Sequence, residues 1–201
     1  MLDAAQRLAG EAGGVRHVTL LAVTEAAGVH PSGVRRYFEN KQELLLELAE
    51  RGWGNWRELV LARIEGAGSL SAAEVAEVLA RTLAAQPLFC DLLAHVPLDL
   101  EGEVSLERVE RFKTASFASH DAIVEALAAA GGLDTAQVAD LITTAICLAA
   151  SLWQVSHPTD TLAELYRRHP AWGHVALEFE PRLVRLLRAT ALGLVDGGSS
   201  R

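Results

Sequence analysis

Four side chains that can hydrogen-bond phosphate oxygens lie close together near the N-terminus. They are two guanidinium groups, a phenol and an ammonium group, at Arg35, Arg36, Tyr37 and Lys41. Two small residues, Ser32 and Gly33, come just before them. Small residues let a backbone come close to the edges of DNA bases, whereas cations and hydroxyl groups contact phosphates. This group of residues therefore favours a surface that binds double-stranded DNA.

The residues from Thr19 to Leu45 contain the elements that would present this surface. Apolar residues recur at helical spacing up to Gly28, which can take a left-handed backbone where that helix ends. Pro31 suits the first turn of a second helix, on which Val34 and Phe38 point inward. The pattern predicts two short helices joined by a tight turn, with the phosphate-binding residues on the outer face of the second.

A third helix is predicted to begin where the second ends. Asn40 is a favourable N-cap, and Glu43 follows it three residues later, as in a capping box. The free N–H groups of this helix end, beside Lys41, form a further phosphate site. The backbone amide of Thr19, and His30 at the cap position of the second helix, complete the candidate DNA-binding residues.

This stretch resembles the DNA-binding domain of the TetR family of transcriptional repressors. The residues that carry the resemblance are Thr19, Val23, Ala27-Gly28-Val29, Pro31-Ser32-Gly33-Val34, Tyr37-Phe38, Lys41 and Glu43-Leu44-Leu45. With the preceding helix, residues 2–12, they cover roughly the first quarter of the chain. The sequence departs from the family pattern at His30, where the cap is usually Ser or Thr, at Thr24, usually a smaller residue, and at Arg35, often tyrosine.

The resemblance implies a ligand-responsive DNA-binding regulator, most often a repressor. Such a protein binds a palindromic operator as a homodimer and is released from it by a small-molecule effector. The paired DNA-binding domains of a two-fold dimer reach successive major grooves about 34–36 Å apart or slightly more.

The charge is distributed unevenly along the chain. The net charge is −8, but the first 51 residues carry six basic and seven acidic side chains, which leaves 12 basic and 19 acidic ones for the rest. The acidic residues are therefore concentrated away from the candidate DNA surface. An acidic body is still unfavourable near a polyanion, so we expect modest DNA affinity that depends steeply on salt.

The composition, half hydrophobic and rich in alanine and leucine, predicts an all-α fold of nine to ten helices. Helices are expected at residues 2–12, 40–65, 71–86, 88–95, 101–130, 134–156 and 161–168, and a last one begins around Pro181. We divide the chain into a three-helix helix-turn-helix domain at 1–50, a helical ligand-binding and dimerisation domain at 51–196, and a disordered tail at 197–201.

The last two long helices are apolar around much of their circumference. Such helices must be covered on more than one side, either in a deep core or across a dimer interface. In TetR-like proteins the equivalent pair forms the dimer.

Two glycines, Gly52 and Gly54, flank Trp53 in the middle of the helix that begins after Asn40. Each costs about 1 kcal/mol relative to alanine inside a helix. They indicate either a hinge between the two domains or close packing of a neighbouring helix, and the sequence does not distinguish the two.

Candidate ligand-binding residues are the aromatic and soft side chains of the middle helices: Trp53, Trp56, Phe89, Cys90, Leu93, Phe112, Phe117 and Trp153. For each one alone, a place in the core is the more common role. Together they predict a largely apolar effector with few polar anchors.

The two cysteines, Cys90 and Cys147, are far apart in apolar surroundings, which favours reduced thiols over a disulfide. The N-terminus lacks the pattern of a signal peptide, and residues 141–155 are too short and too polar to span a membrane. We expect a soluble, cytoplasmic protein with no membrane partner.

The sequence does not favour a metal site at His95 with Asp91, Asp99 and His120, because Pro97 should break the helical spacing between His95 and Asp99. No nucleophile elbow, glycine-rich phosphate loop or carboxylate pair indicates an enzyme, and no cofactor is expected. The alternative function is a helical module that binds small molecules or proteins and has weak or lost DNA binding. It is motivated by the poor cap at His30 and the acidic total.

Overall fold

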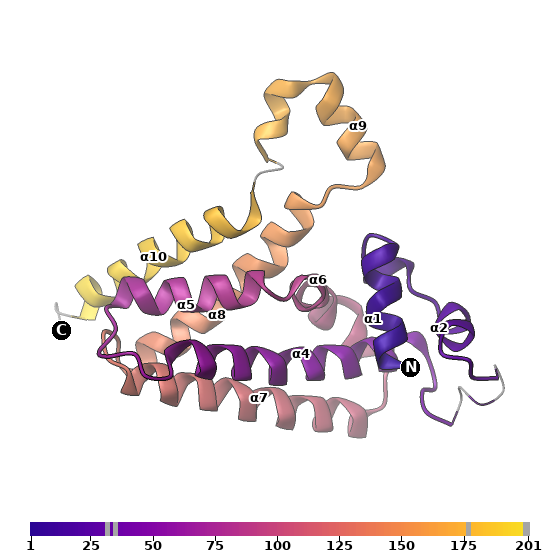
Figure 1. Ribbon diagram of the computed structural model, residues 1–201, viewed down its shortest axis with the longest axis horizontal. Helices are drawn as coiled ribbons and strands as arrows, with labels where there is room; N and C mark the ends of the chain where they lie inside the picture. Colours follow the sequence, from indigo (N-terminus) through magenta and orange to yellow (C-terminus); the bar gives the residue numbers. More distant parts are fainter. Residues whose placement is uncertain (31–32, 34–35, 176–177, 199–201) are drawn as a thin grey trace.

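A computed structural model describes residues 1–30, 33, 36–175 and 178–198, and within these residues it contains nine α-helices and no strand. The predicted all-α class is confirmed. The N-terminal end holds α1 (Leu2–Glu11), the short turn η1 (Val15–His17) and α2 (Leu20–Ala26). These elements, with the described residues that follow them up to the first turn of α4, are called the head. The remaining elements form the body, and Figure 1 shows the head at one end of the body and the C-terminus at the other.

The helix α4 (Lys41–Ile64) runs without interruption from the head into the body. Its start is the predicted one, because the Asn40 side chain accepts a hydrogen bond from the Glu43 amide at 2.8 Å. The Glu43 carboxylate turns back to accept from the amide of Glu39 at 2.7 Å. The proposed domain boundary between residues 50 and 51 falls inside this helix.

Two capping boxes set the starts of α5 (Ala72–Ala84) and α8 (Thr135–Ser156), as the sequence predicts. In each box the cap side chain, Ser71 or Asp134, accepts from the backbone amide three residues later, and that residue's side chain accepts from the cap's own amide. Both ends of these hydrogen bonds lie within four residues, so the local sequence is sufficient to specify them.

The predicted start of the long helix at residue 101 is wrong. After α6 (Pro87–His95) the chain continues through a π-helical turn, η2 (Val96–Leu100), and a 3₁₀ turn, η3 (Glu101–Glu103), before α7 (Leu106–Ala129) begins. The cap of α7 is Ser105, whose hydroxyl accepts from the Arg108 amide at 3.2 Å. Ser105 is a better N-cap than the glutamate expected to open the helix.

In the body, α7 packs along α4, and α10 (Phe179–Gly198) packs along α5 (Figure 1). Between them α8 contacts α6, α7 and α10. One ionic cluster joins α4 to α7, where the buried Arg108 guanidinium reaches Glu47 at 3.0 Å and Glu50 at 2.9 Å. Residues 199–201, part of the predicted tail, lie outside the described residues.

Between α8 and α10 the chain forms an arm of α9 (Asp160–Arg168) and the turn η4 (Pro170–Val175), which projects from the body in Figure 1. No described residue of α9 is buried. The arm therefore contributes little to the core of a single chain.

The space around the two α4 glycines differs. A Cβ atom on Gly52 would lie 2.3 Å from Cδ2 of Phe89 on α6, whereas one on Gly54 would meet nothing within 4 Å. Of the two interpretations left open by the sequence, close packing therefore accounts for Gly52. α4 is a single continuous helix at both positions.

Within the described residues, α8 is the one helix long and apolar enough to cross a membrane by length and composition alone. Core helices of soluble proteins pass the same test, and α8 packs against four other helices of the body, so it is weak evidence for a membrane span.

Candidate functional site

The first helix of the predicted helix-turn-helix is α2. The Thr19 hydroxyl caps it by accepting from the Ala22 amide at 3.2 Å, and Val23 is fully buried. Gly28 ends it with a φ of +66°, in the left-handed region predicted for the turn. Thr24, the departure from the family pattern, is buried, and its hydroxyl donates to the carbonyl of Leu21 at 2.7 Å. This hydroxyl therefore has a partner within its own helix.

The structure describes part of the second helix and of its candidate DNA-binding residues. Ser32 and Arg35 lie outside the described residues, as do Pro31 and Val34. The amide of Gly33 donates to the carbonyl of His30 at 2.8 Å, as expected near a helix start. His30 and Thr19 are exposed at the surface of the head.

Arg36 and Tyr37 point to solvent, and the Tyr37 side chain is 65% exposed. The next residue, Phe38, is half-buried and packs against the core. The outward phenol and guanidinium and the inward Phe38 follow the predicted pattern of exposure, but Arg36 and Tyr37 lie in a turn and Phe38 comes just after it, so the expected helix does not extend to Phe38. An exposed cation beside an exposed phenol gives the head two groups that can reach phosphate oxygens.

Lys41 has a second role that the sequence did not indicate. Its ammonium group donates to the carbonyl of Arg16 at 2.8 Å, which ties the first turn of α4 to η1. Partial burial lowers the pKa of Lys41 from its usual range. An ammonium group has three donors, so contact with a phosphate is compatible with this bond.

The eight candidate ligand-binding residues do not surround one cavity. Trp53, Trp56 and Phe89 pack against one another, with ring centroids 5.5–6.2 Å apart. Cys90, Leu93 and Phe112 are buried in the same core. Phe117 is 60% exposed on α7, and Trp153 lies apart from the cluster, against Phe179 and His157.

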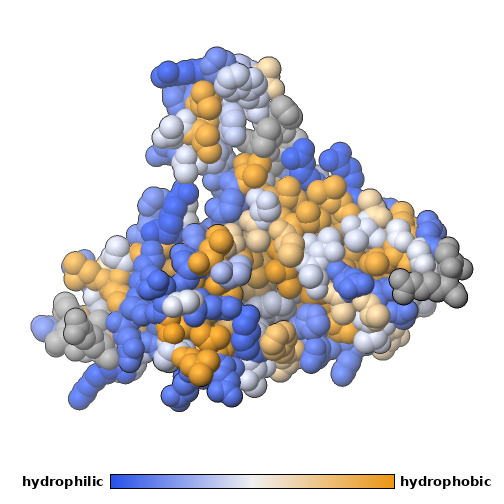
Figure 2. Space-filling model, turned by 180° about the vertical axis from the view of Figure 1, so that it is seen from behind, coloured by the Kyte–Doolittle hydropathy of each residue, from blue (hydrophilic) through white to orange (hydrophobic). Residues whose placement is uncertain are grey.

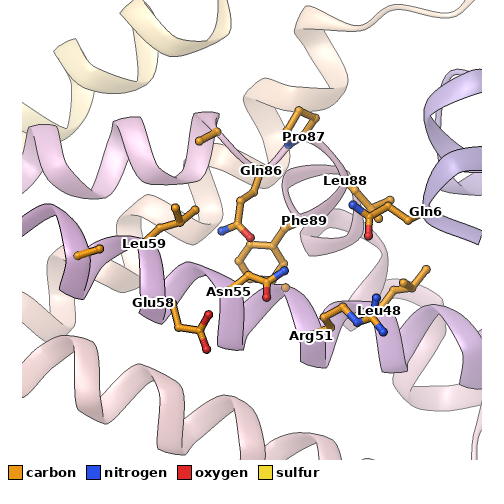
Figure 3. A pocket seen from close by; sticks show the side chains of 13 residues that line it. Gln6, Leu48, Arg51, Asn55, Glu58, Leu59, Gln86, Pro87, Leu88 and Phe89 are labelled. Atoms are coloured by element: carbon orange, nitrogen blue, oxygen red, sulfur yellow. The ribbon is translucent and has the colours of Figure 1, made fainter. Parts of the chain in front are cut away.

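One cavity of about 530 Å³ lies between α4 and the turn from α5 to α6 (Figure 3). Of the eight candidates only Phe89 lines it. Its polar lining residues are Gln6, Arg51, Asn55, Glu58 and Gln86. The sequence did not indicate these residues as a group, because they come from three separate elements.

A second cavity, of about 1060 Å³, lies where the head meets the body, and we call it the junction cavity. It is lined by Gln6, Ala9, Gly10, Ala12, Gly13, Gly14, Arg16, His17, Pro87, Leu88, Asp91, Trp153, His157 and residues 158–161. Trp153 is the candidate residue that it contains. Both cavities share Gln6, Pro87 and Leu88, so they adjoin the contact between α1 and α6.

The expected break in spacing at Pro97 is absent. The π-helical turn keeps the His95 and Asp99 side chains 3.6 Å apart, and His95 also lies 3.9 Å from Asp91. Within the described part of the chain, no group of three or more histidine, cysteine or acidic side chains could hold a metal ion.

Comparison with known families gives two matches that together span nearly the whole chain. Residues 1–48 match the family described as "Bacterial regulatory proteins, tetR family". Residues 50–197 match "Tetracyclin repressor-like, C-terminal domain". A search of curated proteins finds no match to this chain.

Proposed function

The chain belongs to the TetR family of DNA-binding transcriptional regulators, and from this we propose that it is a repressor. We propose further that it binds a palindromic operator as a homodimer in the cytoplasm and leaves the DNA when a small, largely apolar effector binds. Within the second helix, Ser32 and Gly33 approach base edges. Arg35, Arg36, Tyr37, Lys41 and the Thr19 amide hold phosphates, and His30 lies beside them.

One observation supports the proposed DNA-binding surface: Arg36 and Tyr37 are exposed, whereas the next residue, Phe38, faces inward. Phe38 packs on the core and thereby anchors the turn that carries Arg36 and Tyr37. This turn comes shortly before Lys41 and the capped start of α4. Cationic, phenolic and amide donors then face one side of the head, as phosphate recognition requires.

The dimer is supported by the surface of α8 and α10. Only 28% of the most apolar window of α8 is buried within the chain. Its exposed positions include the small residues Ala136, Thr143, Cys147 and Ser151, which allow close approach of another helix. On α10, Leu192 is 53% exposed.

Figure 2 shows apolar side chains gathered on the face seen from behind, between the α9 arm and the C-terminal end. A second copy packed against this surface by two-fold symmetry would cover it. The same symmetry would place two heads side by side for a palindromic site.

Sequence-specific binding tests this proposal. Titration of the native protein into a labelled fragment of the DNA beside its own gene, with excess unrelated competitor DNA, should give a protected palindrome and two chains per site. Specific sites are typically bound about 10³-fold or more tighter than unrelated DNA. Equal affinity for both DNAs would contradict the repressor and support the alternative, a binding module that has lost specific DNA recognition.

A further inference from the structure

The junction cavity contains a carboxylate whose charge has no full counterion. Asp91, on α6, is 7% exposed and lines this cavity. Its Oδ2 accepts from the Val15 amide and its Oδ1 from the Gln154 side-chain amide, each at 2.7 Å. Both donors are neutral. Among the described residues, the one ion pair of Asp91 is with His95 at 3.9 Å, beyond hydrogen-bond distance.

The α8 wall of the same cavity provides a flat apolar surface. The Trp153 indole stacks on His157 with ring centroids 3.7 Å apart and meets Phe179 edge-on. Ala9 and Gly10 of α1 also line this cavity, and neither has a charged or long side chain. An indole face attracts cations as well as apolar rings.

The other charged residues that line the junction cavity, Arg16 and Asp160, are exposed to solvent. Asp160 is a second carboxylate. The single arginine, Arg16, donates its Nε to His17 at 2.9 Å. The lining therefore presents one buried negative charge, at Asp91, and the aromatic surface of the half-buried Trp153.

From this arrangement we propose that the junction cavity binds an organic cation that carries a flat apolar ring, such as an aromatic amidine or amine. Its charged group pairs with Asp91 and its ring lies against Trp153. A volume of about 1060 Å³ accepts a molecule of this class. The cation gains most from Asp91 because a carboxylate held away from water interacts strongly with an opposite charge.

A consequence for the head follows and depends on the proposed function. Asp91 is the body's hydrogen-bond acceptor for Val15, at the start of η1 in the head. Gly14 allows this approach, because its φ is +137° and a Cβ there would lie 3.2 Å from Asp91 Oδ2. A cation on Asp91 draws the carboxylate away from the Val15 amide, so the ligand should lower DNA affinity.

The experiment compares a cation with its neutral isostere. Calorimetric titration of the full chain, without DNA, uses 2-naphthamidine and 2-naphthamide. We expect the amidine to bind at least about tenfold tighter, which is the scale of one charge-assisted hydrogen bond. Binding of neither compound at about 1 mM, or equal binding of both, would overturn the proposal.

Two variants locate the site. Asp91→Asn keeps the shape of the side chain and should reduce the amidine preference to about threefold or less. Gly10→Phe fills the cavity from an exposed helix position where a Cβ meets nothing within 4 Å, and it should abolish binding of both compounds. An unchanged preference in Asp91→Asn, or unchanged binding in Gly10→Phe, would contradict the assignment. If Asp91→Asn does not fold, the preference of the native protein for the amidine and the loss of binding in Gly10→Phe still test the proposal.

The two proposals fail separately. Selective amidine binding by a protein that ignores operator DNA would retain the site and reject the repressor. Specific DNA binding without amidine binding would retain the repressor and reject the site.

Discussion

At the scale of single residues, polar side chains at the junction of head and body bond to backbone far away in the sequence. Asp91 accepts from the Val15 amide, and Lys41 donates to the Arg16 carbonyl. The amide group of Asn40 donates to the carbonyl of Glu103 at 2.8 Å. Together with apolar packing, the Asp91 and Asn40 bonds fix the head on the body, whereas the Lys41 bond lies within the head. A single substitution can remove each one.

Cys90 gives a prediction at this scale. Burial, with a smaller effect from the neighbouring Asp91, raises the pKa of its thiol to about 12, and the thiol donates to the carbonyl of Leu83. Since the thiolate is the reactive form, iodoacetamide at about pH 8 should leave Cys90 unmodified in the folded protein. Peptide mass spectrometry checks this, with the denatured chain as the control in which Cys90 is fully alkylated. Rapid alkylation of Cys90 in the folded protein would contradict its burial.

At the scale of elements, α4 is the part that belongs to both head and body. Its N-terminal turn carries Lys41, its middle packs on α6 through Gly52 and Phe89, and Arg108 fastens its first half to α7. A change in the position of α6 is therefore transmitted to α4 at a contact with no spare space.

Substitution of the two α4 glycines separates packing from helix propensity. Gly52→Ala should destabilise the protein by about 1–3 kcal/mol, because the new methyl group overlaps Phe89. The matched control, Gly54→Ala, should stabilise it by up to about 1 kcal/mol, since the site is open and alanine is the better helix former. Urea unfolding followed by circular dichroism measures both. Destabilisation by Gly54→Ala would show that Gly54 has a conformational role that the helix does not reveal.

The elements also show which features the sequence could predict. The caps at Asn40, Ser71 and Asp134 were predictable, because each involves hydrogen bonds within four residues. The cap of α7 at Ser105 is equally local, and the predicted start at residue 101 overlooked it. The π-helical and 3₁₀ turns before it were not predictable, since they depend on packing against α4. The predicted ligand-binding set rests on residue type, whereas a cavity depends on where side chains leave space. The junction cavity joins residues from Gln6 to Thr161, and no local pattern connects them.

At the scale of the whole molecule, charge and apolar surface are separated. The head has nearly balanced charge and exposes Arg36 and Tyr37, while the body carries most of the acidic excess. One apolar surface lies on α8 and α10 toward the C-terminal end, while single large apolar side chains such as Leu98 and Leu106 are exposed elsewhere (Figures 1 and 2). This separation suits a dimer in which the bodies associate and the heads remain free for DNA.

Dimerisation gives the prediction at this scale. Leu192→Glu places a charge on α10 where a partner should cover Leu192, and it should weaken the dimer by at least about 100-fold. Phe117→Glu is the control, because Phe117 is exposed to a similar degree, 60% against 53%, but lies on α7. Analytical ultracentrifugation measures both, and a dimer that tolerates Leu192→Glu would place the interface elsewhere.

The most direct test of the central claim is the salt dependence of DNA binding by the native protein and by the variants Arg36→Ala and Arg63→Ala. Arg36 is exposed in the head, whereas Arg63 is exposed at the far end of α4. Each lost phosphate contact reduces the slope of log K against log salt by about 0.9, so Arg36→Ala should lower it by about two, one contact in each head. Arg63→Ala should leave the slope unchanged. A native protein that shows no salt-dependent binding, or an Arg36→Ala slope equal to that of the native protein, would contradict the assignment of this surface to DNA.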